Sequence, residues 1–98
     1  MSTGIPKSFQ LLGHTITVRV ISRSKWRHGK SVVGMWIPDK LRIDLLADPI
    51  ETQLQATFCH ELTHALLDMM NHKLSSDEVF VDNLGALLQQ ALTTFKTE

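Results

Sequence analysis

The order of apolar and polar side chains divides the sequence into a β part followed by a helical part. Apolar and polar residues alternate over residues 15–23, a pattern typical of a half-buried strand. Two further runs of strand-forming residues, 32–37 and 41–46, flank Pro-Asp-Lys at 38–40, which favours a turn and predicts a hairpin. The polar segment 24–31 predicts a loop between the first strand and this hairpin.

From residue 48 onward the spacing of apolar residues is helical. Asp48 and Pro49 are typical of a helix start, and apolar positions cover most sides of the helix as far as about Met69. Ser-Ser-Asp-Glu at 75–78 opens a second helix, which we expect to end near Phe95. This order of elements predicts an α+β fold in which a small antiparallel three-stranded sheet packs on the two helices. We expect the polar first eight residues to be a loose start.

The composition is that of one ordinary globular domain. Of the 98 residues 43% are apolar and 20% charged, so we expect residues 1–98 to fold as a single domain. The one cysteine, Cys59, excludes an intramolecular disulfide and a metal site made of cysteines alone. The sequence shows neither a signal peptide nor an apolar run long enough to cross a bilayer. We therefore expect a cytoplasmic protein without a membrane partner.

Candidate chemistry lies in the first helix, at His60-Glu61-Leu62-Thr63-His64. Histidines at positions i and i+4 project from one helix face about 6 Å apart along the axis, so both imidazoles can bind one metal ion. Glu61 lies beside them, where a carboxylate can act as general base on a water at the metal. The pattern therefore predicts one Zn²⁺ held by His60 and His64, with Glu61 as the catalytic residue.

The third zinc ligand is predicted on the second helix. Glu78 and Asp82 share a stripe of that helix with a glycine and an amide, which suits a ligand and an acceptor for a histidine N–H. Two alternatives remain open: Glu78 as part of a capping box with Ser75, and His72 as a loop ligand. For Glu78 to reach the metal, we expect that the first helix ends early or that the two helices cross steeply.

These motifs resemble a known family. The segment His60–Asp68, HELTHALLD, is similar to the zinc-binding helix of thermolysin-like metallopeptidases, the gluzincins, and Glu78-x-x-x-Asp82-x-x-Gly85 is similar to their second motif. The resemblance implies zinc ligation by His60, His64 and Glu78, Glu61 as base, and Asp82 as partner of a ligand histidine. It also implies a peptide or protein substrate lying along an edge strand that includes the residues Val33, Gly34, Met35 and Trp36.

The chain departs from the larger members of that family. The spacer between its two motifs is short, it has no counterpart of the subdomain that closes the cleft, and it contains no tyrosine. It therefore resembles a minimal gluzincin, or one of the small ImmA/IrrE-like metallopeptidases of phage and bacterial origin. The resulting hypothesis is a zinc metalloendopeptidase that hydrolyses peptide bonds.

The charges suggest an alternative function. Residues 1–38 carry six Lys or Arg and no acid, whereas residues 39–98 carry four basic residues and all ten acids. Such asymmetry suggests an interaction surface. Its basic part includes a loop with an aromatic residue that we expect to be exposed, a combination that can contact nucleic acid or a protein partner. The residues concerned are Arg23, Lys25, Trp26, Arg27 and Lys30.

A solvated loop without a partner is the favoured interpretation of that segment. The alternative function is a zinc-stabilised regulatory or binding module with little or no proteolytic activity.

Overall fold

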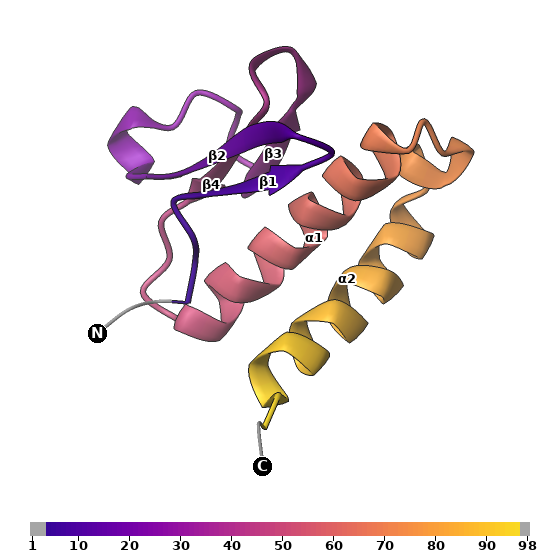
Figure 1. Ribbon diagram of the computed structural model, residues 1–98. Helices are drawn as coiled ribbons and strands as arrows, with labels where there is room; N and C mark the ends of the chain where they lie inside the picture. The colour runs from indigo at the N-terminus through magenta and orange to yellow at the C-terminus, as the bar shows by residue number, and fades with distance from the viewer. Residues whose placement is uncertain (1–3, 97–98) are drawn as a thin grey trace.

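The protein is an α+β domain in which a four-stranded sheet packs against one helix, and the second helix packs on the other side of that helix, so the predicted packing of the sheet on both helices is wrong. The computed structural model describes residues 4–96, and Figure 1 shows the sheet on one side of α1 and the second helix on the other. The strands are β1 (Ser8–Leu11), β2 (His14–Ile21), β3 (Gly34–Ile37) and β4 (Arg42–Leu46), and the helices are α1 (Glu51–Met69) and α2 (Glu78–Thr94).

The sheet differs from the predicted three antiparallel strands in two respects. Its order is β1-β2-β4-β3, and β2 pairs with β4 in parallel. The additional strand β1 pairs with β2 through a tight turn in which Leu12 and Gly13 both have positive φ, 50° and 82°. The prediction missed β1 because the strand has only four residues, Ser8-Phe9-Gln10-Leu11, so its alternation of polar and apolar side chains is too short to stand out. It missed the parallel pair because a local pattern does not determine which strands become neighbours.

The predicted hairpin is present, and it places β3 at an edge of the sheet. β3 and β4 pair antiparallel around a single turn of 3-10 helix at Pro38–Lys40. The chain leaves β2, crosses to the far edge as β3 and returns as β4 into the position beside β2. As a result, one side of β3 has no neighbouring strand within the described residues and faces α1.

The core lies between the sheet and α1, as the alternation of residues predicts. Ile16 of β2 and Ile43 and Leu45 of β4 are fully buried against the helix, where they meet Leu54 and Phe58. Period-two spacing puts these strand residues on one face and leaves polar residues on the other. Because the sheet covers one side of α1 and α2 covers another, this helix is central to the domain (Figure 1).

The two helices neither cross steeply nor end early, contrary to our expectation. They lie side by side in antiparallel directions, and α1 continues to Met69 (Figure 1). The chain then reverses at Asn71, whose φ is 53°, and descends along α1 through a 3-10 helix, η3 (Lys73–Ser76). This descending segment is why α2 can begin beside the middle of α1 and not at its end. In residues 4–96 no helix is long and apolar enough to cross a membrane.

The outer face of the sheet carries a buried carboxylate. Asp44 of β4 is only 1% exposed, and its oxygens lie 2.9 Å from Nε2 of His28, 2.9 Å from Nε of Arg42 and 3.3 Å from Nε of Arg19. Burial alone would raise the pKa of Asp44, but the hydrogen bonds from His28, Arg19 and Arg42 together outweigh it and hold that pKa below its ordinary value. The ion cluster ties the loop after β2 to the sheet.

Trp26 is not exposed, so this part of the loop prediction is wrong. Its side chain is 8% exposed, its indole N–H donates to the carbonyl of Gly29 at 3.2 Å, and its ring meets that of His28 edge-on with centroids 4.8 Å apart. An indole packed in this way cannot stack on a base. Trp26 instead serves, with His28, to hold the loop against the body of the protein.

We predict that Asp44→Asn lowers the free energy of unfolding by about 2 kcal/mol at neutral pH, because Arg19, Arg42 and His28 lose the carboxylate that they share. The pKa of Asp44 is lower in the folded than in the unfolded state, where it is about 3.9. Its stabilisation is therefore complete above the unfolded pKa and is lost as the pH falls through the folded pKa. Urea unfolding should show that the difference in unfolding free energy between parent and variant becomes smaller below about pH 4.

Asp39→Asn is the matched control, since Asp39 is exposed at the turn between β3 and β4. We expect it to change stability by less than about 0.5 kcal/mol. If Asp44→Asn lowered the free energy of unfolding by the same amount in acid and at neutral pH, the lowered pKa of Asp44 would be contradicted.

Candidate metal centre

Two histidines of α1 share the face of the helix that looks into the cleft. His60 and His64 are one turn apart, their side chains are 25% and 17% exposed, and their ring centroids are 4.9 Å apart. The i, i+4 spacing alone produces this arrangement. Both rings are partly exposed to the cleft.

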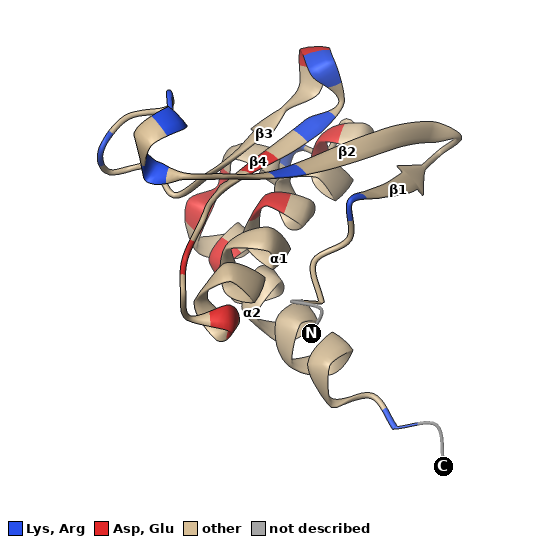
Figure 2. Cartoon of the chain, turned by 90° about the vertical axis from the view of Figure 1, so that its left-hand side faces the viewer, with Lys and Arg blue, Asp and Glu red and all other residues tan. Residues whose placement is uncertain are grey.

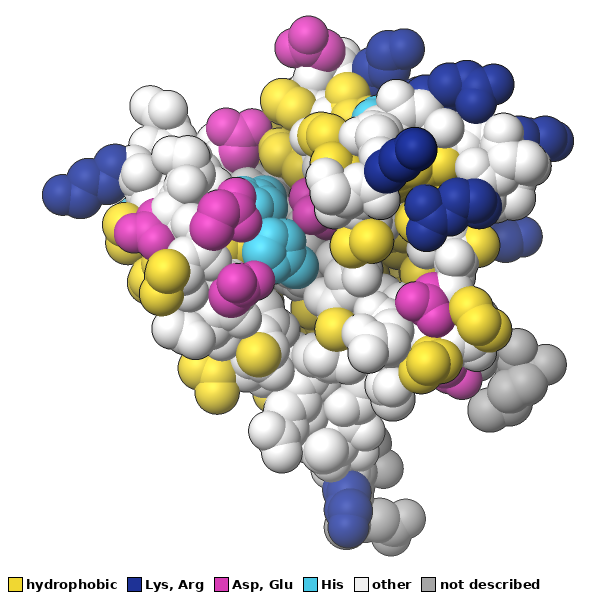
Figure 3. Space-filling model, turned by 180° about the vertical axis from the view of Figure 1, so that it is seen from behind, with side chains coloured by type: hydrophobic (Ala, Val, Ile, Leu, Met, Phe, Trp, Pro, Cys, Tyr) yellow, Lys and Arg dark blue, Asp and Glu magenta, His cyan; other side chains and the backbone are white. Residues whose placement is uncertain are grey.

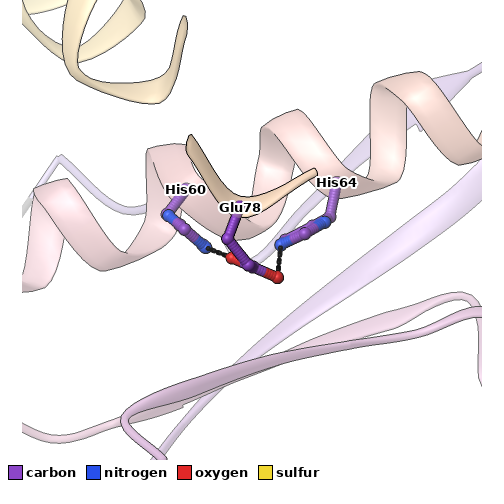
Figure 4. Close-up of side chains that lie close together, drawn as sticks. All are labelled: His60, His64 and Glu78. Atoms are coloured by element: carbon purple, nitrogen blue, oxygen red, sulfur yellow. Dashed lines mark hydrogen bonds and ion pairs between the residues drawn. The ribbon is translucent and has the colours of Figure 1, made fainter. Parts of the chain in front are cut away.

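Glu78 lies across both histidines (Figure 4). Its Oε1 is 3.1 Å from Nε2 of His60, and its Oε2 is 3.3 Å from Nε2 of His64. One ligand atom from each of the three side chains lies within 4.8 Å of the others. The helix cap is made instead by Asp77, whose Oδ1 accepts the N–H of Phe80 at 3.0 Å, so the Glu78 carboxylate is not used in a capping box.

The other ring nitrogen of each histidine faces an acceptor. Nδ1 of His60 is 2.8 Å from Oδ1 of Asp82, and Nδ1 of His64 is 2.6 Å from the backbone carbonyl of Ser75. Since a carboxylate and a carbonyl only accept hydrogen bonds, both Nδ1 atoms must carry the proton. In each neutral imidazole the lone pair of Nε2 then points at a carboxylate oxygen of Glu78.

This geometry requires positive charge between the rings and Glu78. Two nitrogen lone pairs facing carboxylate oxygens at 3.1 and 3.3 Å repel one another unless a cation lies among them. The choices are a second proton on each imidazole or one shared metal ion. The nitrogen and oxygen donors suit Zn²⁺, and the acceptors on Nδ1 are those that commonly orient ligand histidines. The residues therefore fit a zinc ion.

Gly85 allows α2 to approach the histidine face closely. A Cβ at this position would lie 3.2 Å from Cα of His60 and 3.3 Å from the carbonyl oxygen of Cys59. At the far end of the helix pair, the side-chain amide of Gln89 donates to the carbonyl of Thr52 at 3.0 Å. The stripe that begins with Glu78 and Asp82 thus faces α1 along its whole length.

Glu61 lies between the histidines and the edge strand. It is 8% exposed, and its Oε1 accepts the backbone N–H of Trp36 at 2.9 Å. Burial raises the pKa of Glu61, and the nearby histidines and the hydrogen bond from Trp36 lower it by less. A carboxylate with a raised pKa beside the His60, His64 and Glu78 side chains is suited to accept a proton.

The cluster opens into a cleft of about 790 Å³ between β3 and α1. The four residues predicted to bind substrate line its β3 side, and in Figure 3 the histidines lie in a hollow surrounded by acidic side chains. Among the described residues that line the cleft, none is Lys or Arg. The lining also includes the acids Glu61, Asp68, Glu78 and Asp82.

Two contacts at this site were not predicted from the sequence. The indole N–H of Trp36 donates to Asp68 at 3.0 Å, which fastens the edge strand to the last turns of α1. The carbonyl of Ser75 orients His64, and because any residue type has a carbonyl, no sequence signal identifies it. One sequence feature pointed to the Trp36 contact. Asp68 lies on the same stripe of the helix as His60 and His64, so its carboxylate is expected on the same face.

Three other candidate groups lie away from the cleft. The exposed His72 accepts the N–H of Leu74 with Nδ1 at 3.1 Å, at the start of η3, and it is not part of the ligand cluster. Cys59 belongs to the core, and burial raises the pKa of its thiol. The basic residues of loop 22–31 do not line the cleft.

The chain matches no protein-family model, no curated protein and no solved structure at a significant level. The interpretation of the site therefore depends on its own geometry.

Gly34 provides a test of how closely β3 approaches α1. A Cβ at this position would lie 2.6 Å from Cγ2 of Thr57 and 3.0 Å from Cγ of Glu61. We predict that Gly34→Ala lowers the free energy of unfolding by about 1–3 kcal/mol, because the strand or the helix must shift. Urea unfolding measures the change.

Adding Thr57→Ser removes the nearer of the two clashing atoms and keeps the hydroxyl that donates to Gln53. We expect this second change to restore part of the stability lost in Gly34→Ala. A Gly34→Ala variant as stable as the parent would show that β3 does not lie so close to α1.

Proposed function

We propose that this protein is a zinc-dependent peptidase that uses His60, His64 and Glu78 as metal ligands. The supporting observation is that one ligand atom from each of these three side chains lies within 4.8 Å of the others, while the Nδ1 atom of each histidine faces an acceptor. Three protein ligands facing an open cleft are typical of catalytic zinc sites, whereas structural sites are closed by four.

A zinc ion bound there would act as a Lewis acid, which polarises a carbonyl group and lowers the pKa of a water molecule. Glu61 accepts the proton of the attacking water at its carboxylate and later transfers it to the leaving amine. Its burial suits the first step, because a raised pKa makes the carboxylate a better proton acceptor. Asp82 and the Ser75 carbonyl keep the two imidazoles in the tautomer that ligation needs.

The edge strand β3 would bind the substrate backbone. In antiparallel pairing alternate residues direct their N–H and C=O groups away from the neighbouring strand, and the N–H of Trp36 is such a group. An extended peptide can therefore add to this edge as a further strand, with its backbone running past the histidines. When substrate enters, the Trp36 N–H would donate its hydrogen bond to the peptide instead of to Glu61. This change of acceptor would free the Glu61 carboxylate.

We predict that the protein binds one zinc ion with ligands from α1 and α2. His60→Ala, His64→Ala and Glu78→Ala should each weaken zinc affinity by at least about a hundredfold, whereas Asp82→Ala, which removes only the partner of His60, should weaken it about ten- to a hundredfold. Competition with a chromophoric chelator measures the affinities, and circular dichroism checks that each variant is folded.

His72→Ala is the matched control, because this histidine is exposed and lies outside the cluster. It should bind zinc like the parent. Equal zinc affinity of the parent and the Glu78→Ala variant would exclude Glu78 as a ligand.

We predict that Glu61→Gln retains one zinc ion but loses at least about a hundredfold in the rate of peptide cleavage, since an amide cannot accept the proton. Cleavage is measured by mass spectrometry on a library of unstructured peptides, together with the zinc content of each sample. Glu51→Gln makes the same chemical change at the exposed start of α1 and should cleave like the parent.

Cleavage by Glu61→Gln at the parental rate would contradict the role of Glu61. A zinc-loaded parent that cuts no peptide in the library would contradict the peptidase function itself.

A further inference from the structure

The loop between β2 and β3 displays four cationic side chains to solvent. In segment 22–31 the exposed basic residues are Arg23, Lys25, Arg27 and Lys30. Among the described residues none of the four forms an ion pair with a carboxylate. Their charges are therefore not neutralised by the protein.

The loop is attached to the protein at two points. Trp26 is buried and bonded to the carbonyl of Gly29, and His28 contacts the buried carboxylate of Asp44 at 2.9 Å. These two side chains point inward from the same segment in which the four basic ones point outward. The attachment fixes the loop backbone, so less conformational entropy is lost when a ligand binds the basic side chains than in a free loop.

The local charge is strongly positive. The buried Asp44 is already paired with Arg42 and with Arg19, whose side chain is 52% exposed and adds a further cation near the loop. In Figure 2 most Lys and Arg residues lie on the sheet and the loop, whereas most Asp and Glu residues lie with the helices and their connections. In Figure 3 the blue side chains gather away from the histidines. A polyanion on the loop would therefore avoid the acidic cleft.

The chemistry of the exposed side chains identifies the class of polyanion. Besides the four cations, the exposed residues of segment 22–31 are serines and a glycine. Arg, Lys and Ser side chains are the usual donors to phosphate oxygens. The loop exposes no apolar side chain that would enter a bilayer, which argues against a membrane surface. It also exposes no aromatic ring that would stack on a base.

We propose that loop 22–31 binds the phosphate backbone of nucleic acid, without preference for base sequence. Four phosphate contacts give a slope of about −3.6 for the logarithm of the affinity against the logarithm of the salt concentration. This is an affinity loss of about a hundredfold between about 50 and about 200 mM salt. The inference does not depend on peptidase activity, because the loop residues do not line the cleft.

The experiment uses the full chain and a fluorescent DNA duplex of about 20 base pairs, with anisotropy measured over a range of salt concentrations. Arg23→Gln/Lys25→Gln and Arg27→Gln/Lys30→Gln should each reduce the slope to about −1.8. Lys73→Gln/Lys96→Gln removes the same charge from the helical side of the molecule and should bind like the parent. A second duplex of unrelated sequence should bind with the same affinity as the first.

Three results would overturn the proposal. They are absence of binding at low salt, equal weakening by the loop variants and the Lys73/Lys96 control, and tighter binding to vesicles of anionic phospholipid than to the duplex.

Discussion

The central helix α1 lies between the sheet and α2, and both neighbours approach it closely at a glycine, where an added Cβ would be tight against α1. Gly34 brings the edge strand against Thr57 and Glu61, and Gly85 brings α2 against the backbone at His60. The candidate site depends on these approaches. With larger residues the strand would move away from Glu61, and α2 would carry Glu78 and Asp82 away from His60.

The same packing surrounds the two histidines with hydrogen-bond acceptors. Each histidine is held from both ends, by an acceptor at Nδ1 and by Glu78 at Nε2, and the two rings are held by different parts of the returning chain. With neutral imidazoles a cluster with this many acceptors lacks positive charge, which a second proton on each ring or a bound cation would supply. A bound cation would stabilise the contact between α1 and α2 as well as supply chemistry, since its ligands come from both helices.

The separation of charge along the sequence becomes a separation in space. The basic N-terminal part forms β2, β3 and the intervening loop, and the acidic C-terminal part forms the helices that line the cleft (Figure 2). Asp44 connects the two parts, because it is a buried acid of the second part that contacts Arg19 and His28 of the first. It ties the loop to the sheet, while the exposed cations of the loop have no carboxylate partner among the described residues.

The sequence by itself determined the features that depend on local periodicity. These are the central helix with two histidines on one face, the second helix, the β3–β4 hairpin and the α+β class. Short-range spacing suffices for them, because side chains three or four residues apart on a helix, or two apart on a strand, share a face. The tertiary structure decided the parallel pairing of β2 with β4, the burial of Trp26, the choice of the Ser75 carbonyl as partner of His64, and the Trp36–Asp68 contact. Each of these depends on which distant segments pack together, and that is set by the burial of the whole core and by the path of the returning chain.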